Sequence, residues 1–142
     1  MIGIKARGKI EDKLDELIEK AHKFIDETKI WNSDLDKTQF RNLLDLASSV
    51  ESFKVIENFI FYQMGRDTKS KSWSSISNRK AFGELLIEEL KSLEKVAEEI
   101  ANQTKEEVKT IYIELVKLYI GYANRYFTFK KEEKKKAEGG RE

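Results

Sequence analysis

Apolar side chains return every three or four residues along most of the chain, which is the spacing of an amphipathic α-helix. A first helix is predicted over residues 9–29. Its apolar positions are Ile10, Leu14, Leu17, Ile18, Ala21 and Ile25. Proline is absent and glycine occurs only seven times, so few residues interrupt a helix. The pattern predicts an all-α protein, a single-domain bundle of about five helices.

The next two helices are expected to pack in sequence after a short break. A second helix, capped by Ser33 or Asp34, runs through Ser49. A third covers about 51–64. Gly65 is expected just beyond its end, because glycine adopts the left-handed conformation at little cost. Residues 66–77 are expected to form a polar loop.

Two further helices complete the predicted bundle, and no strand is expected. The fourth spans about 79–102, capped by Ser77 or Asn78. The fifth spans about 105–129, with Thr104 and Glu107 as a capping box. Its stretch 111-IYIELVKLYIGYANRYF-127 is apolar nearly all round, which predicts a position at the centre of the bundle or against a partner chain.

The 142-residue length fits one domain, which is expected to be a helical bundle over residues 1–129. The remaining 130-KKEEKKKAEGGRE-142 is charged and poor in apolar residues. Such a segment buries too little apolar surface to offset its ordering entropy. It is therefore predicted to be a disordered tail.

Composition excludes several classes of site. The chain has no cysteine, which excludes disulfides, thiolate chemistry and cysteine-based zinc sites. A single histidine, His22, excludes a histidine-rich metal site, and no cofactor is expected. No apolar run approaches the roughly 20 residues of a membrane span, so we expect a cytoplasmic protein without membrane contact.

Charge is nearly balanced overall, with 27 basic and 26 acidic residues, but it is segregated along the chain. Residues 64–80 have a net charge of +4, and residues 81–103 have a net charge of −4. The basic residues of the first segment are Arg66, Lys69, Lys71, Arg79 and Lys80, and its acidic residue is Asp67. Composition alone favours a solvated loop there. The alternative is phosphate binding by the cations and hydroxyl groups, with Trp73 either stacked on a base or buried in the core.

Catalytic patterns are missing from the sequence, so no enzyme and no catalytic residue are predicted. His22 has no serine or cysteine near it that it would activate. Glu19 precedes His22 at the spacing of helical metal sites, but a second such pair is absent. There is no glycine-rich phosphate loop.

Three segments of the chain carry patterns of a known protein family: 38-TQFRNLLDLA-47, 62-YQMGR-66 and the aromatic-rich 111-IYIELVKLYIGYANRYF-127. Together they resemble the small α-helical subunit of type III-A (Csm) CRISPR effector complexes. The segment 38-TQFRNLLDLA-47 resembles the Thr-x-Gln-x-Arg start of the family's second helix, with Thr38 and Gln39 adjacent here. The segment 62-YQMGR-66 resembles the family's Tyr-x-x-Gly-Arg and is followed by basic residues, as in the family. The segment 111–127 is similar to the family's aromatic closing helix. The resemblance covers about residues 36–129.

This resemblance implies a non-catalytic subunit in an RNA-guided antiviral defence complex. Such subunits are present in several copies, associate with one another and with the other effector subunits, and hold the guide and target RNA. Arg41 and Arg66 match the motif arginines, and Lys69 and Lys71 follow in the matching basic segment. Further RNA-binding candidates from charge alone are Lys37, Arg79 and Lys80. A subunit that serves any guide contacts phosphates and 2′-hydroxyls, not base edges.

Plainer interpretations stay open beside this one. Arg41 is spaced to pair with Asp45, and Arg66 to satisfy the carbonyls at a helix end. Tyr62 is expected in the core. The alternative function is a helical interaction or scaffold protein, a homodimer that binds no nucleic acid. It would use the aromatic residues of the last helix, which are Tyr112, Tyr119, Tyr122, Tyr126 and Phe127.

Overall fold

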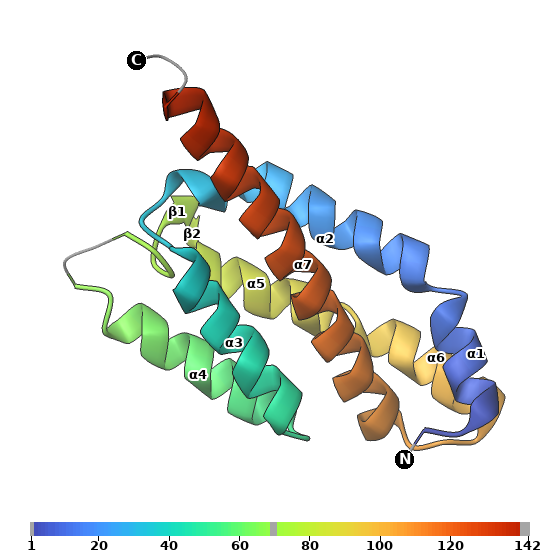
Figure 1. Cartoon of the computed structure of the whole chain (residues 1–142). Coiled ribbons are helices and arrows are strands. Elements are labelled where there is room, and N and C mark those ends of the chain that lie inside the picture. The colour runs from blue at the N-terminus through green and yellow to red at the C-terminus, as the bar shows by residue number, and fades with distance from the viewer. Residues whose placement is uncertain (1, 69–70, 140–142) are drawn as a thin grey trace.

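The computed structural model describes residues 2–68 and 71–139, and it confirms the all-α class (Figure 1). The helices are α1 (Ile4–Glu11), α2 (Leu14–Thr28), the short 3-10 helix η1 (Ile30–Asn32), α3 (Lys37–Ser49), α4 (Phe53–Gly65), α5 (Phe82–Lys91), α6 (Glu94–Thr104) and α7 (Val108–Gly139). No helix within the described ranges combines the length and apolar character needed to cross a lipid bilayer.

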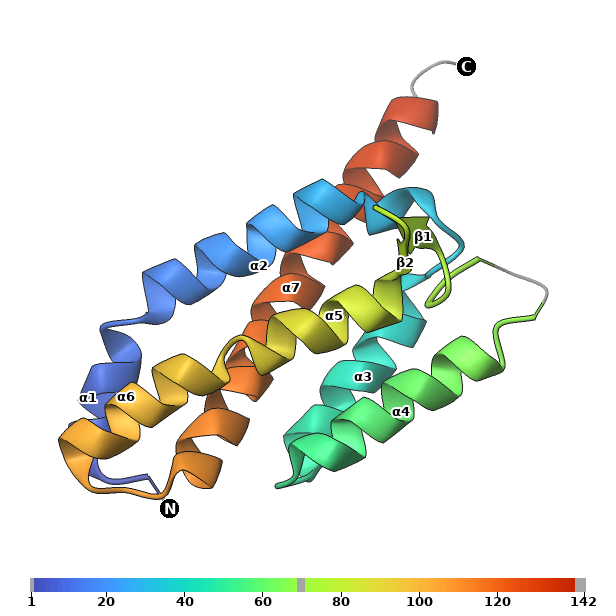
Figure 2. The same cartoon turned by 180° about the vertical axis from the view of Figure 1, so that it is seen from behind.

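The last helix, α7, lies at the centre of the bundle, as predicted from its apolar character. It packs mainly against α2, α3 and α6 (Figures 1 and 2). Tyr119, Ile120 and Phe127 have no exposed side-chain surface. Because α2, α3 and α6 pack around α7, most of its apolar residues are buried, whereas Arg125 is exposed and Glu114 and Lys117 are partly exposed.

Two of the predicted helices are each divided by a bend. The first bends between α1 and α2, where the Lys13 amide donates to the Ile10 carbonyl at 2.9 Å. The other bends between α5 and α6, where the Leu93 amide donates to the Leu90 carbonyl at 3.2 Å. Both are tightened turns within helical backbone, so neither needs glycine or proline. The first bend lets α1 pack on α6 while α2 packs on α7.

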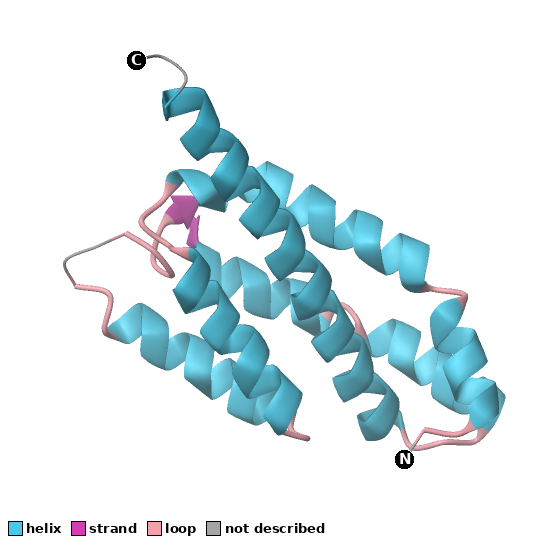
Figure 3. Cartoon of the chain, in the orientation of Figure 1, coloured by secondary structure: helices cyan, strands magenta, loops and turns pink. Residues whose placement is uncertain are grey.

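A small hairpin precedes α5, where only loop and helix were predicted (Figure 3). Strand β1 (Ile76–Ser77) pairs antiparallel with β2 (Lys80–Ala81). Asn78 and Arg79 connect them with φ of 52° and 71°, the left-handed backbone that a tight hairpin turn requires. The fourth helix therefore begins at Phe82, not near residue 79.

Several predicted helix ends are wrong in detail. Asp36, not Ser33 or Asp34, caps α3: its side chain accepts from the Gln39 amide, and the Gln39 side chain accepts from the Asp36 amide. This is a complete capping box. Gly65 is the last residue of α4 and does not have a positive φ.

The predicted capping box at Thr104 and Glu107 is also wrong. The Thr104 hydroxyl donates back to the Ile100 carbonyl at 2.7 Å. Lys105, with φ of 58°, ends α6 in the left-handed conformation. The last helix therefore begins at Val108 and not near residue 105.

Of the segment 130–142, predicted to be disordered, residues 130–139 continue α7 through Gly139, and residues 140–142 lie outside the described residues. Tertiary contacts explain the difference. The Lys131 ammonium donates to the carbonyls of Trp31 at 3.1 Å and Ser33 at 2.9 Å. Lys37 of α3 forms an ion pair with Glu132. These contacts hold the first turn after Phe129, and the helix extends from it.

Trp73 belongs to the core. It is 1% exposed, and its ring centroid lies 6.2 Å from that of Phe40 and 6.0 Å from that of Phe82. Of the two roles considered for this residue, the structure supports the core anchor. Trp73 thereby anchors the loop before α5 in the core, beside the first turns of α3 and α5.

Candidate nucleic-acid interface

A polar groove of about 310 Å³ lies between α3, α4 and the loop that follows α4. Its lining residues are Gln39, Asn42, Gln63, Arg66, Asp67, Ser72 and Trp73. Gln39 belongs to the segment 38–47, and Gln63 and Arg66 belong to 62–66. Two of the three segments that carry the resemblance are thus separate in the sequence but border one groove.

The wall formed by the loop is fixed by Asp67. Its carboxylate accepts hydrogen bonds from the amide and hydroxyl groups of both Ser72 and Ser74. The Lys71 amide donates to Asp34 Oδ2 at 2.8 Å, and the Asp34 amide donates to the Lys71 carbonyl at 3.0 Å. The single acidic residue of the basic segment therefore organises the loop.

Arg66 lies at the rim of this groove and is exposed. Its backbone amide donates to the Tyr62 carbonyl at 3.0 Å, which closes the last turn of α4. Its guanidinium carbon lies 5.4 Å from the centroid of the Tyr62 ring, within the range of a cation–π contact. The backbone closes the helix end, so the side chain is not needed for that task.

Tyr62, predicted to lie in the core, is a surface residue with an exposed fraction of 60%, and the neighbouring Phe61 is exposed as well, at 53%. The buried positions of α4 are instead Ile56, Glu57 and Ile60. The helix therefore turns its final aromatic pair outward. Both side chains therefore lie on the solvent-exposed surface, with the Tyr62 ring beside the Arg66 guanidinium.

Arg41 is not in the groove. Its Nε lies 3.0 Å from Asp45 Oδ1, the pairing that its spacing allowed. Lys37, one turn earlier on the same side of α3, pairs with Glu132 of α7. This flank of α3 faces α7, whereas Gln39 and Asn42 face α4. The two motif arginines therefore do not share the groove: Arg41 lies on α3 outside it, and Arg66, at the end of α4, lines it.

The remaining candidates are distributed over the loop and the hairpin. Lys71 exposes its side chain beside the groove wall. Arg79 is exposed in the hairpin turn. Lys80 is bound to Glu88 of α5, and this hydrogen bond and charge raise the pKa of Lys80. Lys69 lies outside the described residues.

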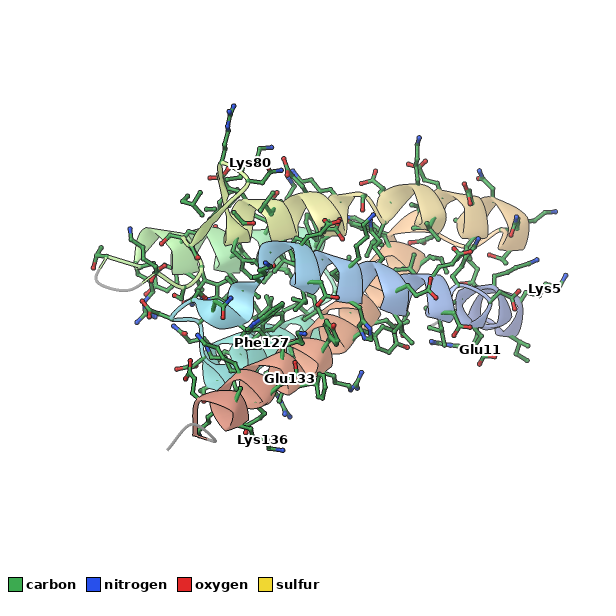
Figure 4. The ribbon with its side chains drawn as sticks, turned by 90° about the horizontal axis from the view of Figure 1, so that it is seen from above. Lys5, Glu11, Lys80, Phe127, Glu133 and Lys136 are labelled. Carbon is green, nitrogen blue, oxygen red and sulfur yellow. The ribbon has the colours of Figure 1, made fainter. Side chains whose placement is uncertain are left out.

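The basic residues within 2–68 and 71–139 do not gather on one continuous face. Figure 4 shows Lys80 and Lys136 on separate edges of the molecule. Lys37 and Arg41 occupy a third position, on the flank of α3 that faces α7. Among the residues that the structure describes, Arg66 is the one basic side chain in the polar lining of the groove.

Three polar residues of the groove, Gln39, Asn42 and Gln63, were not predicted from the sequence. Gln39 uses its carbonyl oxygen in the capping box, which leaves its amide nitrogen as a donor. The spacing of Gln39 and Asn42 in the sequence indicates only that the two share a side of α3, because residues three apart in a helix are neighbours. Their alignment with Gln63 depends on how α3 packs against α4.

A larger hollow, about 700 Å³, lies between the end of α2, the hairpin and α5. Its lining includes Glu27, Glu88 and Glu89. Carboxylates repel phosphate, so this hollow is unsuited to a nucleic-acid backbone. None of its lining residues lines the α3–α4 groove.

The His22 ring packs against an aromatic side chain of α7. It stacks on Tyr126 with centroids 4.0 Å apart and an interplanar angle of 14°. The Tyr126 hydroxyl donates to Asp26 Oδ1 at 2.8 Å. Burial and this hydrogen bond raise the pKa of Tyr126 to about 12. In the part of the chain that the structure describes, no three His, Asp or Glu side chains gather as metal ligands.

No protein-family model, curated protein or solved structure matches the chain. The geometry of the groove and the two motif segments around it are therefore the basis for a functional assignment.

Proposed function

We propose that the protein is a non-catalytic small subunit of a type III-A RNA-guided effector complex and that it binds RNA through the α3–α4 groove. The supporting observation is that two of the segments resembling that family meet around one polar groove. Its partners are the guide and target RNA, other effector subunits and further copies of itself, in the cytoplasm.

Arg66 is the main phosphate ligand in this proposal. A guanidinium donates two parallel hydrogen bonds to a phosphate and stays charged at any physiological pH. The amides of Gln39, Asn42 and Gln63 supply neutral donors and acceptors along the groove. Such groups suit phosphate oxygens and ribose hydroxyls and do not require a particular base.

Asp67 lines the same groove, and its charge would oppose RNA if it were unscreened. Its carboxylate oxygens already accept from Ser72 and Ser74. These donors disperse the negative charge within the loop. Lys71, beside the loop wall, adds positive charge at the surface, and Lys69 lies two residues earlier in the sequence.

The structure gives less support to the alternative function, a homodimeric scaffold protein. This alternative relied on aromatic residues of the last helix as a dimer surface. Tyr119 and Phe127 are fully buried in their own chain, and Tyr112 is 8% exposed. Tyr122 and Tyr126 are half-buried. Little of that aromatic surface is left for a second copy.

The test is a titration of the full chain against a fluorescent single-stranded RNA of about 16 nucleotides, a length that spans a typical binding site. Affinity is measured by anisotropy between about 50 and 200 mM salt, because phosphate contacts weaken with salt. Arg66→Glu is compared with Lys95→Glu, which makes the same charge change on exposed α6 surface.

We expect Arg66→Glu to weaken binding by about tenfold or more and Lys95→Glu to change it little. Arg66→Ala should reduce the salt slope by about 0.7, the value for one phosphate contact on a single strand. Absence of binding at the lowest salt, or equal loss in both charge-reversal variants, would count against the proposal.

A further inference from the structure

Tyr62 is an aromatic side chain on the outer surface of a protein whose other large rings are mostly buried. It is 60% exposed and lies at the solvent side of α4. Its ring contacts the guanidinium of Arg66, with 5.4 Å from the guanidinium carbon to the ring centroid. No core packing requires a ring at this position.

The placement of Tyr62 follows from helix geometry. Arg66 is four residues later, which is about one turn, so both side chains share one side of α4. Gln63, the next residue after Tyr62, lies inside the polar groove with Arg66. Tyr62 therefore stands at the groove's outer rim.

Phe61 is also exposed but lies elsewhere around the helix. Five residues separate it from Arg66, which corresponds to about 140° around the axis. It is four residues after Glu57, which pairs with Lys91 of α5. Phe61 is therefore on the α5 flank, away from the groove.

We propose that Tyr62 stacks on an unpaired base while Arg66 holds the neighbouring phosphate, so that the groove selects single-stranded over duplex nucleic acid. This inference rests on the proposed function and adds the class of ligand. A tyrosine face on a helix surface reaches a base only if that base is not stacked inside a duplex. The Arg66 guanidinium, which lies beside the Tyr62 ring, would hold the phosphate next to the stacked base.

A protein partner fits this surface less well. The other exposed apolar residue on this side of α4 is Val55, which is 43% exposed and lies about two turns away. Asn58, between them, is polar and exposed. The apolar surface is thus interrupted, whereas an aromatic ring, an arginine and amide groups are adjacent at the groove. That combination matches a nucleotide.

The experiment compares Tyr62→Ser with the matched control Phe61→Ser, which removes an equally exposed ring one residue away. Each full-length variant is titrated with the same single-stranded RNA and with its duplex. Tyr62→Ser should weaken single-strand binding by about 5- to 100-fold, the usual effect of losing one base–aromatic stack, and leave duplex binding nearly unchanged. Tyr62→Phe should retain binding, because it keeps the ring.

The possible failures are distinguishable. If the unaltered chain binds neither RNA, the proposed function fails and the stacking role with it. If Arg66→Glu weakens binding but Tyr62→Ser acts like Phe61→Ser, or weakens single strand and duplex equally, only the stacking role is overturned. A change in sedimentation mass on Tyr62→Ser, with RNA affinity intact, would assign the surface to a protein contact instead and likewise overturn it.

Discussion

Asp67 accepts hydrogen bonds from the amide of Ser72 at 3.0 Å and from its hydroxyl at 2.9 Å. Ser72 is 1% exposed and adjoins the buried Trp73. The pair therefore joins the end of α4 to the core anchor of the following loop. It sets the shape of one groove wall.

Removing this carboxylate should destabilise the fold. Asp67→Ala leaves the amides of Ser72 and Ser74 without their acceptor, and we expect a loss of about 2 kcal/mol in the free energy of unfolding. The measurement is urea denaturation followed by circular dichroism. Asp45→Ala, which removes only the exposed partner of Arg41, should cost at most about 0.5 kcal/mol. Equal effects would contradict the role assigned to Asp67.

Glu57 should make stability depend on pH in the acidic range. Burial raises its pKa, but hydrogen bonds and charges from Lys91 and Lys54 outweigh burial, so the pKa is lowered. Lys91 Nζ lies 3.1 Å from Glu57 Oε2. Because the folded pKa is below the unfolded one, the ionised carboxylate stabilises the fold above about pH 4.3. That contribution is lost as pH falls through the folded pKa.

The corresponding variant is Glu57→Gln. We expect it to lower the free energy of unfolding by about 1 kcal/mol at pH 7 and to approach the unaltered chain below about pH 4. Denaturation curves at several pH values measure this, with the exposed Glu99→Gln as control. If the difference in the free energy of unfolding between Glu57→Gln and the unaltered chain grew toward low pH, the role assigned to the ionised Glu57 would be contradicted.

Gly83 allows α4 and α5 to approach closely. A Cβ atom there would lie 2.6 Å from Met64 Sδ and 3.0 Å from Ile60 Cγ2. Gly83→Ala should therefore destabilise by about 1–3 kcal/mol through overpacking. Combining it with Met64→Ala should cost less than the sum of the two single changes, because the clash is removed.

Gly8 supplies the matched control for this experiment. A Cβ atom at Gly8 would meet nothing within 4 Å. Gly8→Ala, in the middle of α1, should stabilise by about 0.5–1 kcal/mol. A stabilising effect at Gly83 would show that the helices separate more easily than the structure implies.

Lys131 should hold the end of α7 against η1. Lys131→Ala removes the donor to the Trp31 and Ser33 carbonyls. We expect amide hydrogen exchange over residues 132–139 to accelerate by about fivefold, equivalent to about 1 kcal/mol. Lys135→Ala, at an exposed position, is the control. An unchanged exchange rate in Lys131→Ala would show that the helix end stands without this contact.

Hydrophobic periodicity was sufficient to predict the helical class and the central position of α7. It missed the bends at Asp12–Lys13 and Ser92–Leu93, because both keep helical backbone and contain neither glycine nor proline. It missed the hairpin because Arg79 takes a left-handed conformation that its residue type does not favour. Local rules do not detect features that tertiary packing imposes.

The candidate site was predictable only in part. Arg66 was identified from its motif, and Lys71 from its motif and local charge. Arg41 was identified in the same way, but its position on the α7-facing flank depends on how α3 packs. Tyr62, predicted to lie in the core, is exposed, and Trp73, for which a stacking role and a core role were both open, is buried. The burial of Trp73 depends on the loop that Asp67 organises, and hydrophobic periodicity does not predict the shape of that loop.

The most direct test of the central claim is nuclear magnetic resonance mapping of single-stranded RNA on the full chain at low salt. The side-chain amide signals of Gln39, Asn42 and Gln63 and the backbone amide of Ser72 report on the groove. The account predicts that these signals shift first and most. Largest shifts on the glutamate-rich surface of α6, or none anywhere, would contradict it.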